Sequence, residues 1–183
     1  MYVDENGNDA IYVSLYTWND GGLPIVGHAM LYYQDKLGNW RLTEYTGKKP
    51  KKAIVYDDFA FDSTKELLNF LVGLNCDYKY LEGDFSKIED YADVNKGFNY
   101  EGYKLFKNNC LHYVKNALKY SDVNLYMNDT IIPKNFNPFV IKIGCGGGLS
   151  LINNQHNESS LGGIATLYCY EKTNSFNYLM RIF

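Results

Sequence analysis

The sequence predicts an α+β domain in which a mainly antiparallel sheet packs against helices. Strand-like segments stand near both ends of the 183-residue chain, and the helical patterns lie between them. Segregation of strands and helices along the chain is typical of this class. The content of 18 tyrosines and 10 phenylalanines favours a substantial sheet. We expect residues 1–9 to be a linker remnant and residues 10–183 to form a single domain, which is long enough to bury a core.

Two segments in the first third of the chain are expected to pair as a hairpin. Residues 28–34 (HAMLYYQ) and 40–46 (WRLTEYT) are rich in β-branched and aromatic residues, and the turn sequence DKLGN separates them. A first strand is predicted over residues 10–18. A closing hairpin is predicted over residues 164–171 and 177–183.

Helical periodicity marks the middle of the chain. Residues 62–75 (DSTKELLNFLVGLN) combine the spacing of a capping box with a leucine stripe. Residues 108–122 (NNCLHYVKNALKYSD) give the clearest helix, with Asn108 or Asn109 as the N-cap. Residues 76–102 are mixed, and we expect a further helix within the stretch DFSKIEDYADV.

Composition argues against several functional classes. The net charge of −3 gives no reason to expect nucleic acid as a partner. The basic run GKKPKK is typical of a solvated loop. The four cysteines form no CxxC pair and have no accompanying histidine cluster, so we expect no metal or other cofactor and favour free thiols. No apolar run approaches the length of a membrane span, so stable membrane insertion is not expected.

Cys110 is the candidate nucleophile. It falls in the first turn of the clearest helix, where unpaired backbone N–H groups and the helix dipole favour an anion. It shares the apolar helix face with Val114 and Ala117, so its sulfur is expected to point toward the sheet. We expect the N–H groups of the helix start, at Asn109 and Leu111, to act as oxyanion donors. The alternative is an inert, buried core thiol.

Three histidines compete as the base that would serve Cys110. His112 lies two residues after the cysteine, and residues two apart on a helix point about 200° apart, so its ring is expected to face away. His156 lies in the polar stretch NNQHNES, which offers nothing to hold an imidazole. His28 opens a predicted strand and is the expected partner of a cysteine that faces the sheet. The alternative for His28 is a purely structural residue.

The group that orients the imidazole depends on the register of the predicted hairpin. With Tyr32 opposite Trp40, His28 lies opposite Glu44, which places a carboxylate beside the imidazole. We therefore expect Glu44, whose alternative role is an exposed strand carboxylate. A different register would change the third residue. The candidates that stay open are Tyr45 and Thr43.

The motifs GHAMLYY, EYTG and Y.L..NNC..YV..AL, in this order, resemble permuted papain-like cysteine hydrolases, which include NlpC-type and lecithin:retinol acyltransferase-like proteins. In that group the histidine strand precedes the cysteine helix, as His28 precedes Cys110. The chain resembles even more closely the C-terminal domains of RHS-repeat polymorphic toxin-like proteins, in which a segment similar to YVDENGNDAIYVSL marks the exit from the repeat shell. The resemblance covers residues 2–120. It implies Cys110 as nucleophile and His28 as base, with Glu44 at a third position that varies between families.

The resemblance implies a cysteine-dependent peptidase or amidase that acts through a thiolate and an acyl-enzyme, in a toxin or effector context. It further implies peptide or peptidoglycan-like substrates and an immunity or carrier protein as partner. A lipid acyl hydrolase or acyltransferase is the alternative chemistry on this fold. A non-catalytic binding module is the alternative outside catalysis, because the tyrosine-rich composition suits a recognition surface. The opening stretch MYVDENGNDA lacks the features of a signal peptide, so we expect cytoplasmic localisation as expressed, with secretion as part of a larger effector.

Overall fold

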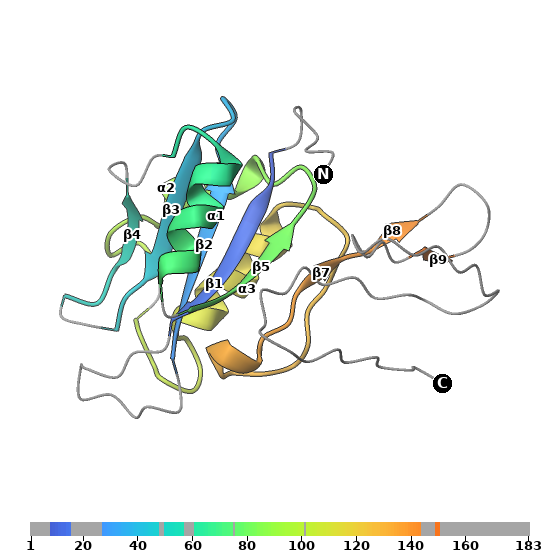
Figure 1. The fold of residues 1–183 in the computed structure, drawn as a ribbon. Coiled ribbons are helices and arrows are strands. Elements are labelled where there is room, and N and C mark those ends of the chain that lie inside the picture. Colours follow the sequence, from blue (N-terminus) through green and yellow to red (C-terminus); the bar gives the residue numbers. More distant parts are fainter. Residues whose placement is uncertain are drawn as a thin grey trace.

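The computed structural model describes residues 8–15, 27–47, 50–56, 61–74, 76–100, 102–143 and 149–150. The main strands are β1 (Ala10–Leu15), β2 (His28–Gln34), β3 (Trp40–Tyr45), β4 (Ala53–Tyr56) and β5 (Cys76–Leu81). The helices are α1 (Thr64–Gly73), α2 (Lys87–Asn95) and α3 (Cys110–Tyr120). The five strands form one antiparallel sheet in the order β4-β3-β2-β1-β5 (Figure 1). The predicted α+β class with an antiparallel sheet is therefore confirmed.

Shorter elements follow α3. A two-residue strand pair joins β6 (Leu125–Tyr126) to β7 (Phe139–Val140), with the 3-10 helix η1 (Pro133–Asn135) between them. The buried hydroxyl of Tyr12 on β1 donates to the Pro133 carbonyl at 2.7 Å, which holds η1 against the sheet. A further pair, β8 (Lys142–Ile143) with β9 (Leu149–Ser150), projects from the body of the fold (Figure 1).

Helices cover both faces of the sheet, because successive residues of a strand point to opposite sides. On one face, Leu67 and Leu71 of α1 pack in a core that includes Met30 and Tyr32 of β2. On the other face, α2 and α3 pack in a core that includes Ala29, Leu31 and Tyr33 of the same strand. Cys110 belongs to this second core, as the helical periodicity predicted. The sheet therefore separates α1 from α3, and β2 runs between them.

Most of the predicted elements are confirmed within the described residues. The strand at 28–34 has the predicted bounds, and the helices predicted at 62–75 and 108–122 form over slightly shorter spans. In the five-stranded sheet, two strands were not predicted, namely β4, which is four residues long and follows the lysine-rich run, and β5, which lies in the segment of mixed character. The short strands β6 to β9 were not predicted either. The predicted closing hairpin lies outside the described residues.

The β2–β3 register differs from the prediction. Met30 rather than His28 lies opposite Glu44, and Gln34 lies opposite Trp40. The predicted register is therefore wrong by two residues. A slip of two leaves every side chain on its original face, so the apolar pattern of the strands cannot detect it.

The turn sets the register instead. The carboxylate of Asp35, a residue only 2% exposed, accepts hydrogen bonds from the backbone N–H groups of Leu37 and Asn39 at 2.9 and 2.8 Å. It also accepts from Nε of Arg41 at 3.1 Å. Burial alone would raise the pKa of Asp35, but these bonds outweigh it and lower the pKa. One buried carboxylate thus closes the turn and aligns both strands.

The segment ahead of β1 is tied into the sheet. Asp9 exchanges bonds with Gln34, since its N–H donates to Gln34 Oε1 at 2.8 Å and its carbonyl accepts from the Gln34 N–H at 2.9 Å. Its carboxylate accepts from the Gly83 N–H at 3.0 Å. Asn8 accepts from the Phe85 N–H at 2.7 Å. The last two residues of the predicted linker remnant therefore make specific contacts with the domain.

Candidate active site

The first turn of α3 is capped by a reciprocal pair. Asn109 is the N-cap, and its Oδ1 accepts from the backbone N–H of His112 at 3.1 Å. In return, Nδ1 of His112 faces the backbone N–H of Asn109 at 3.5 Å. Burial lowers the pKa of His112, and the charge of Lys115 adds to this. His112 therefore serves the start of the helix, which agrees with the expectation that it does not face Cys110.

The Asn109 side chain also joins the two loops beside Cys110. Its Nδ2 donates to the Leu105 carbonyl at 2.7 Å and to the Ile131 carbonyl at 3.3 Å. The residue is 1% exposed, so these bonds are shielded from water. One buried amide thus holds the helix start, the preceding loop and the loop that leads to η1.

Free backbone donors remain at the start of α3. The N–H groups of Cys110 and Leu111 find no acceptor within the described ranges, as expected for the first turn of a helix. The N–H of Asn109 faces His112 instead. Of the predicted oxyanion donors, Leu111 keeps its N–H available, and the N–H of Cys110 joins it.

Cys110, His28 and Glu44 lie together where β2 begins. The sulfur of Cys110 accepts from the Ala29 N–H at 3.5 Å, and the cysteine side chain lies near enough to the imidazole of His28 to raise its pKa. Nε2 of His28 lies 2.5 Å from Oε2 of Glu44. The side chains of His28 and Glu44 are 21% and 12% exposed, whereas Cys110 is 3% exposed. The structure therefore brings the three predicted residues together, at a site that opens to solvent mainly beside the imidazole.

The contact between His28 and Glu44 runs diagonally across the hairpin. Glu44 lies opposite Met30, and His28 lies two residues before Met30 on the same face of β2. Diagonal neighbours of this kind remain within reach of long side chains. The carboxylate thus meets the imidazole although the register differs from the predicted one.

The imidazole of His28 is strongly perturbed. Burial alone would lower its pKa, but hydrogen bonds to Cys110 and Glu44, together with their charges, outweigh burial and raise the pKa to about 10. An imidazole with this pKa is protonated at neutral pH. The site therefore favours an imidazolium held between a carboxylate and a sulfur.

The other candidates for the third position make different contacts. Thr43 is fully buried, and its hydroxyl bonds the Tyr113 hydroxyl at 2.8 Å and the Ile54 carbonyl at 2.9 Å. Tyr45 packs in an aromatic cluster with Tyr113. Of the three candidates, Glu44 is the one that meets His28.

Two tyrosines that the sequence did not single out complete the surroundings. The hydroxyl of Tyr56 donates to Oε1 of Glu44 at 2.7 Å. Burial, and next the nearby Cys110, raise the pKa of the half-buried Tyr103 to about 12. A Cβ at Gly47 would lie 2.8 Å from Cζ of Tyr103, so the glycine makes room for this ring. The sequence offered a pattern that could have found each tyrosine. Tyr56 ends a short β-branched run, and Tyr103 opens the motif that leads to Cys110.

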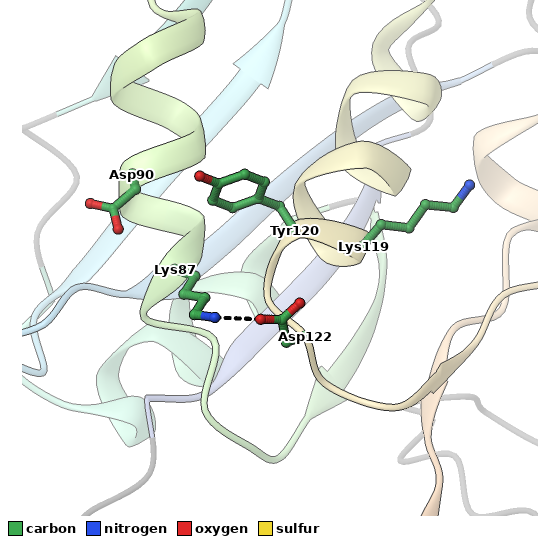
Figure 2. Close-up of a pocket in the computed structure, with 5 residues that line it drawn as sticks. All are labelled: Lys87, Asp90, Lys119, Tyr120 and Asp122. Atoms are coloured by element: carbon green, nitrogen blue, oxygen red, sulfur yellow. Dashed lines mark hydrogen bonds and ion pairs between the residues drawn. The ribbon is translucent and has the colours of Figure 1, made fainter.

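A separate hollow lies at the other end of α3. It has a volume of about 410 Å³ and is lined by polar side chains of α2, the end of α3 and the turn that follows: Lys87, Asp90, Lys119, Tyr120 and Asp122. Lys87 pairs with Asp122 across it, and Figure 2 shows Lys119 pointing away from this pair. Both members of the ion pair are more than half exposed, at 54% and 73%. Such pairs contribute little energy, and the hollow brings together none of the predicted site residues.

The described part of the chain contains two cysteines and no evident metal site. Cys76 and Cys110 are free thiols there, whereas Cys145 and Cys169 lie outside it. Among those same residues, no group of three or more histidine, cysteine, aspartate or glutamate side chains could hold a metal ion. No helix of the described ranges is both long and apolar enough to cross a bilayer.

Comparisons with known proteins give one structural likeness. No family model and no curated protein sequence matches the chain. The fold is similar to that of a solved type VI secretion system effector, TseH, with a TM-score of 0.47 and 17% sequence identity. The match covers 70% of this chain and 83% of that one. At this level the likeness assigns neither a family nor an activity.

Proposed function

We propose that the protein is a cysteine-dependent hydrolase in which Cys110 is the nucleophile, His28 the acid–base and Glu44 the group that orients the imidazole. The observation that carries the proposal is the contact of these three side chains at the start of a helix. A thiol, an imidazole and a carboxylate in series are the parts that nucleophilic acyl transfer requires. The reaction proposed is hydrolysis of an amide bond.

The raised pKa of His28 supports a resting state in which the imidazole already holds the proton. In this proposed state the sulfur faces the imidazolium, the Ala29 N–H at 3.5 Å and the positive end of the α3 dipole, all of which favour an anionic nucleophile. This differs from a neutral pair in which the base removes the proton only when substrate binds. Glu44 balances the charge of the imidazolium from the other side.

The thiolate attacks the substrate carbonyl, and a carbon–sulfur bond forms while the carbonyl oxygen becomes an oxyanion. The free N–H groups of Cys110 and Leu111 are the donors proposed for that oxyanion. The His28 imidazolium gives its proton to the leaving amine, and the carbon–nitrogen bond breaks to leave a thioester. Water then attacks the thioester and gives a proton to His28, which releases the carboxylic acid and restores the thiolate.

Chain order supports a permuted papain-like arrangement, because the histidine strand β2 precedes the cysteine helix α3. Together with the motifs around His28, Glu44 and Cys110, this order favours a peptidase or amidase that works as a toxin or effector domain. Peptides, including peptidoglycan stem peptides, are the substrates proposed. An immunity or carrier protein is the partner proposed for this role.

The decisive variant is Cys110→Ala, with Cys76→Ala as its matched control because Cys76 is the other described free thiol. In hydrolysis of peptidoglycan fragments and of peptide amides, Cys110→Ala should reduce kcat/KM by at least about a thousandfold, and Cys76→Ala should leave it unchanged. Both variants should keep the circular dichroism spectrum. Activity that survives in a folded Cys110→Ala protein would refute the proposal.

A second test needs no substrate. Site-resolved alkylation with iodoacetamide should label Cys110 at similar rates at about pH 6 and pH 8, because the imidazolium keeps the thiolate present, whereas labelling of an ordinary thiol falls with acidity. In His28→Ala, labelling of Cys110 should instead fall at about pH 6, as it does for an ordinary thiol. Because Cys110 is 3% exposed, the ratio between the two pH values, rather than the absolute rate, is the quantity to compare. A ratio that is the same in the wild type and in His28→Ala would contradict the proposed ion pair.

A further inference from the structure

Both oxygens of the Glu44 carboxylate have a specific partner. Oε2 lies 2.5 Å from Nε2 of His28, and Oε1 accepts from the hydroxyl of Tyr56 at 2.7 Å. Tyr56 is the last residue of the edge strand β4 and is half-buried. The side chains of three adjacent strands, β2, β3 and β4, therefore form one continuous polar chain that ends at the sulfur of Cys110.

The pairing of the strands explains this arrangement. Glu44 lies opposite Met30 on one side and opposite Ile54 on the other. His28 and Tyr56 each stand two residues away from these positions and on the same face, so they approach Glu44 along diagonals from opposite sides. With one oxygen held by Tyr56, rotation of the carboxylate is restricted, and the second oxygen faces the imidazole.

The phenol acts as a donor in this chain. Burial first, and then the bond to Glu44 and the charge of that carboxylate, raise the pKa of Tyr56 well above its ordinary value. The hydroxyl therefore keeps its proton over the whole range in which His28 titrates. A donor to a carboxylate stabilises the ionised form, and an ionised Glu44 stabilises the imidazolium of His28.

We infer that Tyr56 is a positioning residue of the proposed hydrolase, whose hydroxyl orients Glu44 and thereby aligns His28 with Cys110. This inference rests on the proposed function for its kinetic consequence only. It assigns a role to a residue outside the cysteine, histidine and carboxylate of the site.

The test compares Tyr56→Phe with Tyr12→Phe. Both variants remove one hydroxyl whose hydrogen bond is 2.7 Å long, but the hydroxyl of Tyr12 binds the Pro133 carbonyl, away from Glu44. The titration of His28 is followed by NMR in protein with labelled histidine, and its signal is assigned as the one that His28→Ala lacks. In Tyr56→Phe the pKa of His28 should fall by about one unit toward its ordinary value, as expected from the loss of one hydrogen bond to a charged group. In Tyr12→Phe it should stay unchanged.

Kinetics provide the second readout. Tyr56→Phe should lower kcat roughly tenfold with little change in KM, and the alkaline limit of activity should move to lower pH. A melting temperature and near-ultraviolet spectrum close to those of the wild type would show that the fold is kept. A purely structural role of Tyr56 would lower the stability of Tyr56→Phe without changing the pKa of His28 or the alkaline limit of activity.

The outcomes separate the two proposals. A His28 pKa that is raised in the wild type and unchanged in Tyr56→Phe would overturn the positioning role and leave the proposed function standing. A wild-type His28 that titrates near its ordinary value would overturn the imidazolium arrangement on which the role of Tyr56 depends. If Cys110→Ala keeps the activity, the hydrolase proposal fails, while the NMR comparison still decides whether Tyr56 orients Glu44.

Discussion

Asn109 and His112 complete each other's hydrogen bonds at the start of α3, one residue before and two residues after Cys110. This arrangement gives the histidine nearest the cysteine in sequence a structural task. It also leaves the backbone N–H groups of Cys110 and Leu111 without acceptors in the described part of the chain. The position of the sulfur therefore depends on a cap that lies outside the proposed catalytic groups.

Replacing Asn109 with alanine should lower the free energy of unfolding by about 1–3 kcal/mol, because the cap and two buried bonds from Nδ2 are lost together. His112→Ala should cost less, about 0.5–1 kcal/mol, because it keeps the bond from its own N–H to Asn109 and loses only the contacts of the imidazole with Asn109. Urea unfolding followed by circular dichroism measures both. The control is Asn108→Ala, which loses an exposed bond to the Gly102 carbonyl and should stay within about 0.5 kcal/mol of the wild type. Equal losses for Asn108→Ala and Asn109→Ala would contradict the role of the cap.

The stability that His28 contributes should depend on pH with a definite sign. Its pKa in the folded protein is about 10, above the ordinary histidine value of 6.5, so the folded state binds the proton more tightly than the unfolded state. Its contribution is fully present below pH 6.5 and is lost as the pH rises toward 10. The difference in unfolding free energy between the wild type and His28→Ala should therefore shrink across this window.

His112 supplies the opposite control for that measurement. Its pKa is lowered, so its contribution should grow as the pH rises toward the ordinary histidine value of 6.5 and then stay level. Unfolding in urea at several pH values, for the wild type and both alanine variants, gives the two curves. A His28 difference that stays flat or grows with pH would show that its pKa is not raised.

Gly47→Ala should disturb the site through Tyr103. The new methyl group would lie 2.8 Å from Cζ of the ring, so the ring, which stands close enough to Cys110 to sense its charge, must shift. A loss of about 1–3 kcal/mol in unfolding free energy is expected from this overpacking, together with lower activity. Gly102→Ala is the matched control, because a Cβ there meets no atom within 4 Å. If the double variant Gly47→Ala with Tyr103→Ala is as unstable as the sum of the single variants, the clash is not the cause.

Local patterns in the sequence account for the parts of the site that depend on a single element. Helical periodicity placed Cys110 on the face that meets the sheet, and strand alternation placed His28 and Glu44 on one face of a hairpin. The register was wrong because a slip of two keeps that alternation, and the bonds that decide it come from the side chain of Asp35 in the turn. Tyr56 was missed because its partner, Glu44, lies on another strand, and β4 is too short to stand out from the lysine-rich run beside it.

The spacing of these residues along the chain has a consequence for assembly. His28 and Glu44 are 16 residues apart within one hairpin, whereas the contact from Ala29 to Cys110 spans 81 residues. Closing the longer loop costs about 1.4 kcal/mol more in chain entropy, so the imidazole and carboxylate are expected to meet before α3 docks. Until then the thiol is open to oxidants, which convert cysteine first to a sulfenic acid and then to forms that cannot be reversed. The time between synthesis and docking of α3 is thus the interval in which the protein depends most on a reducing environment.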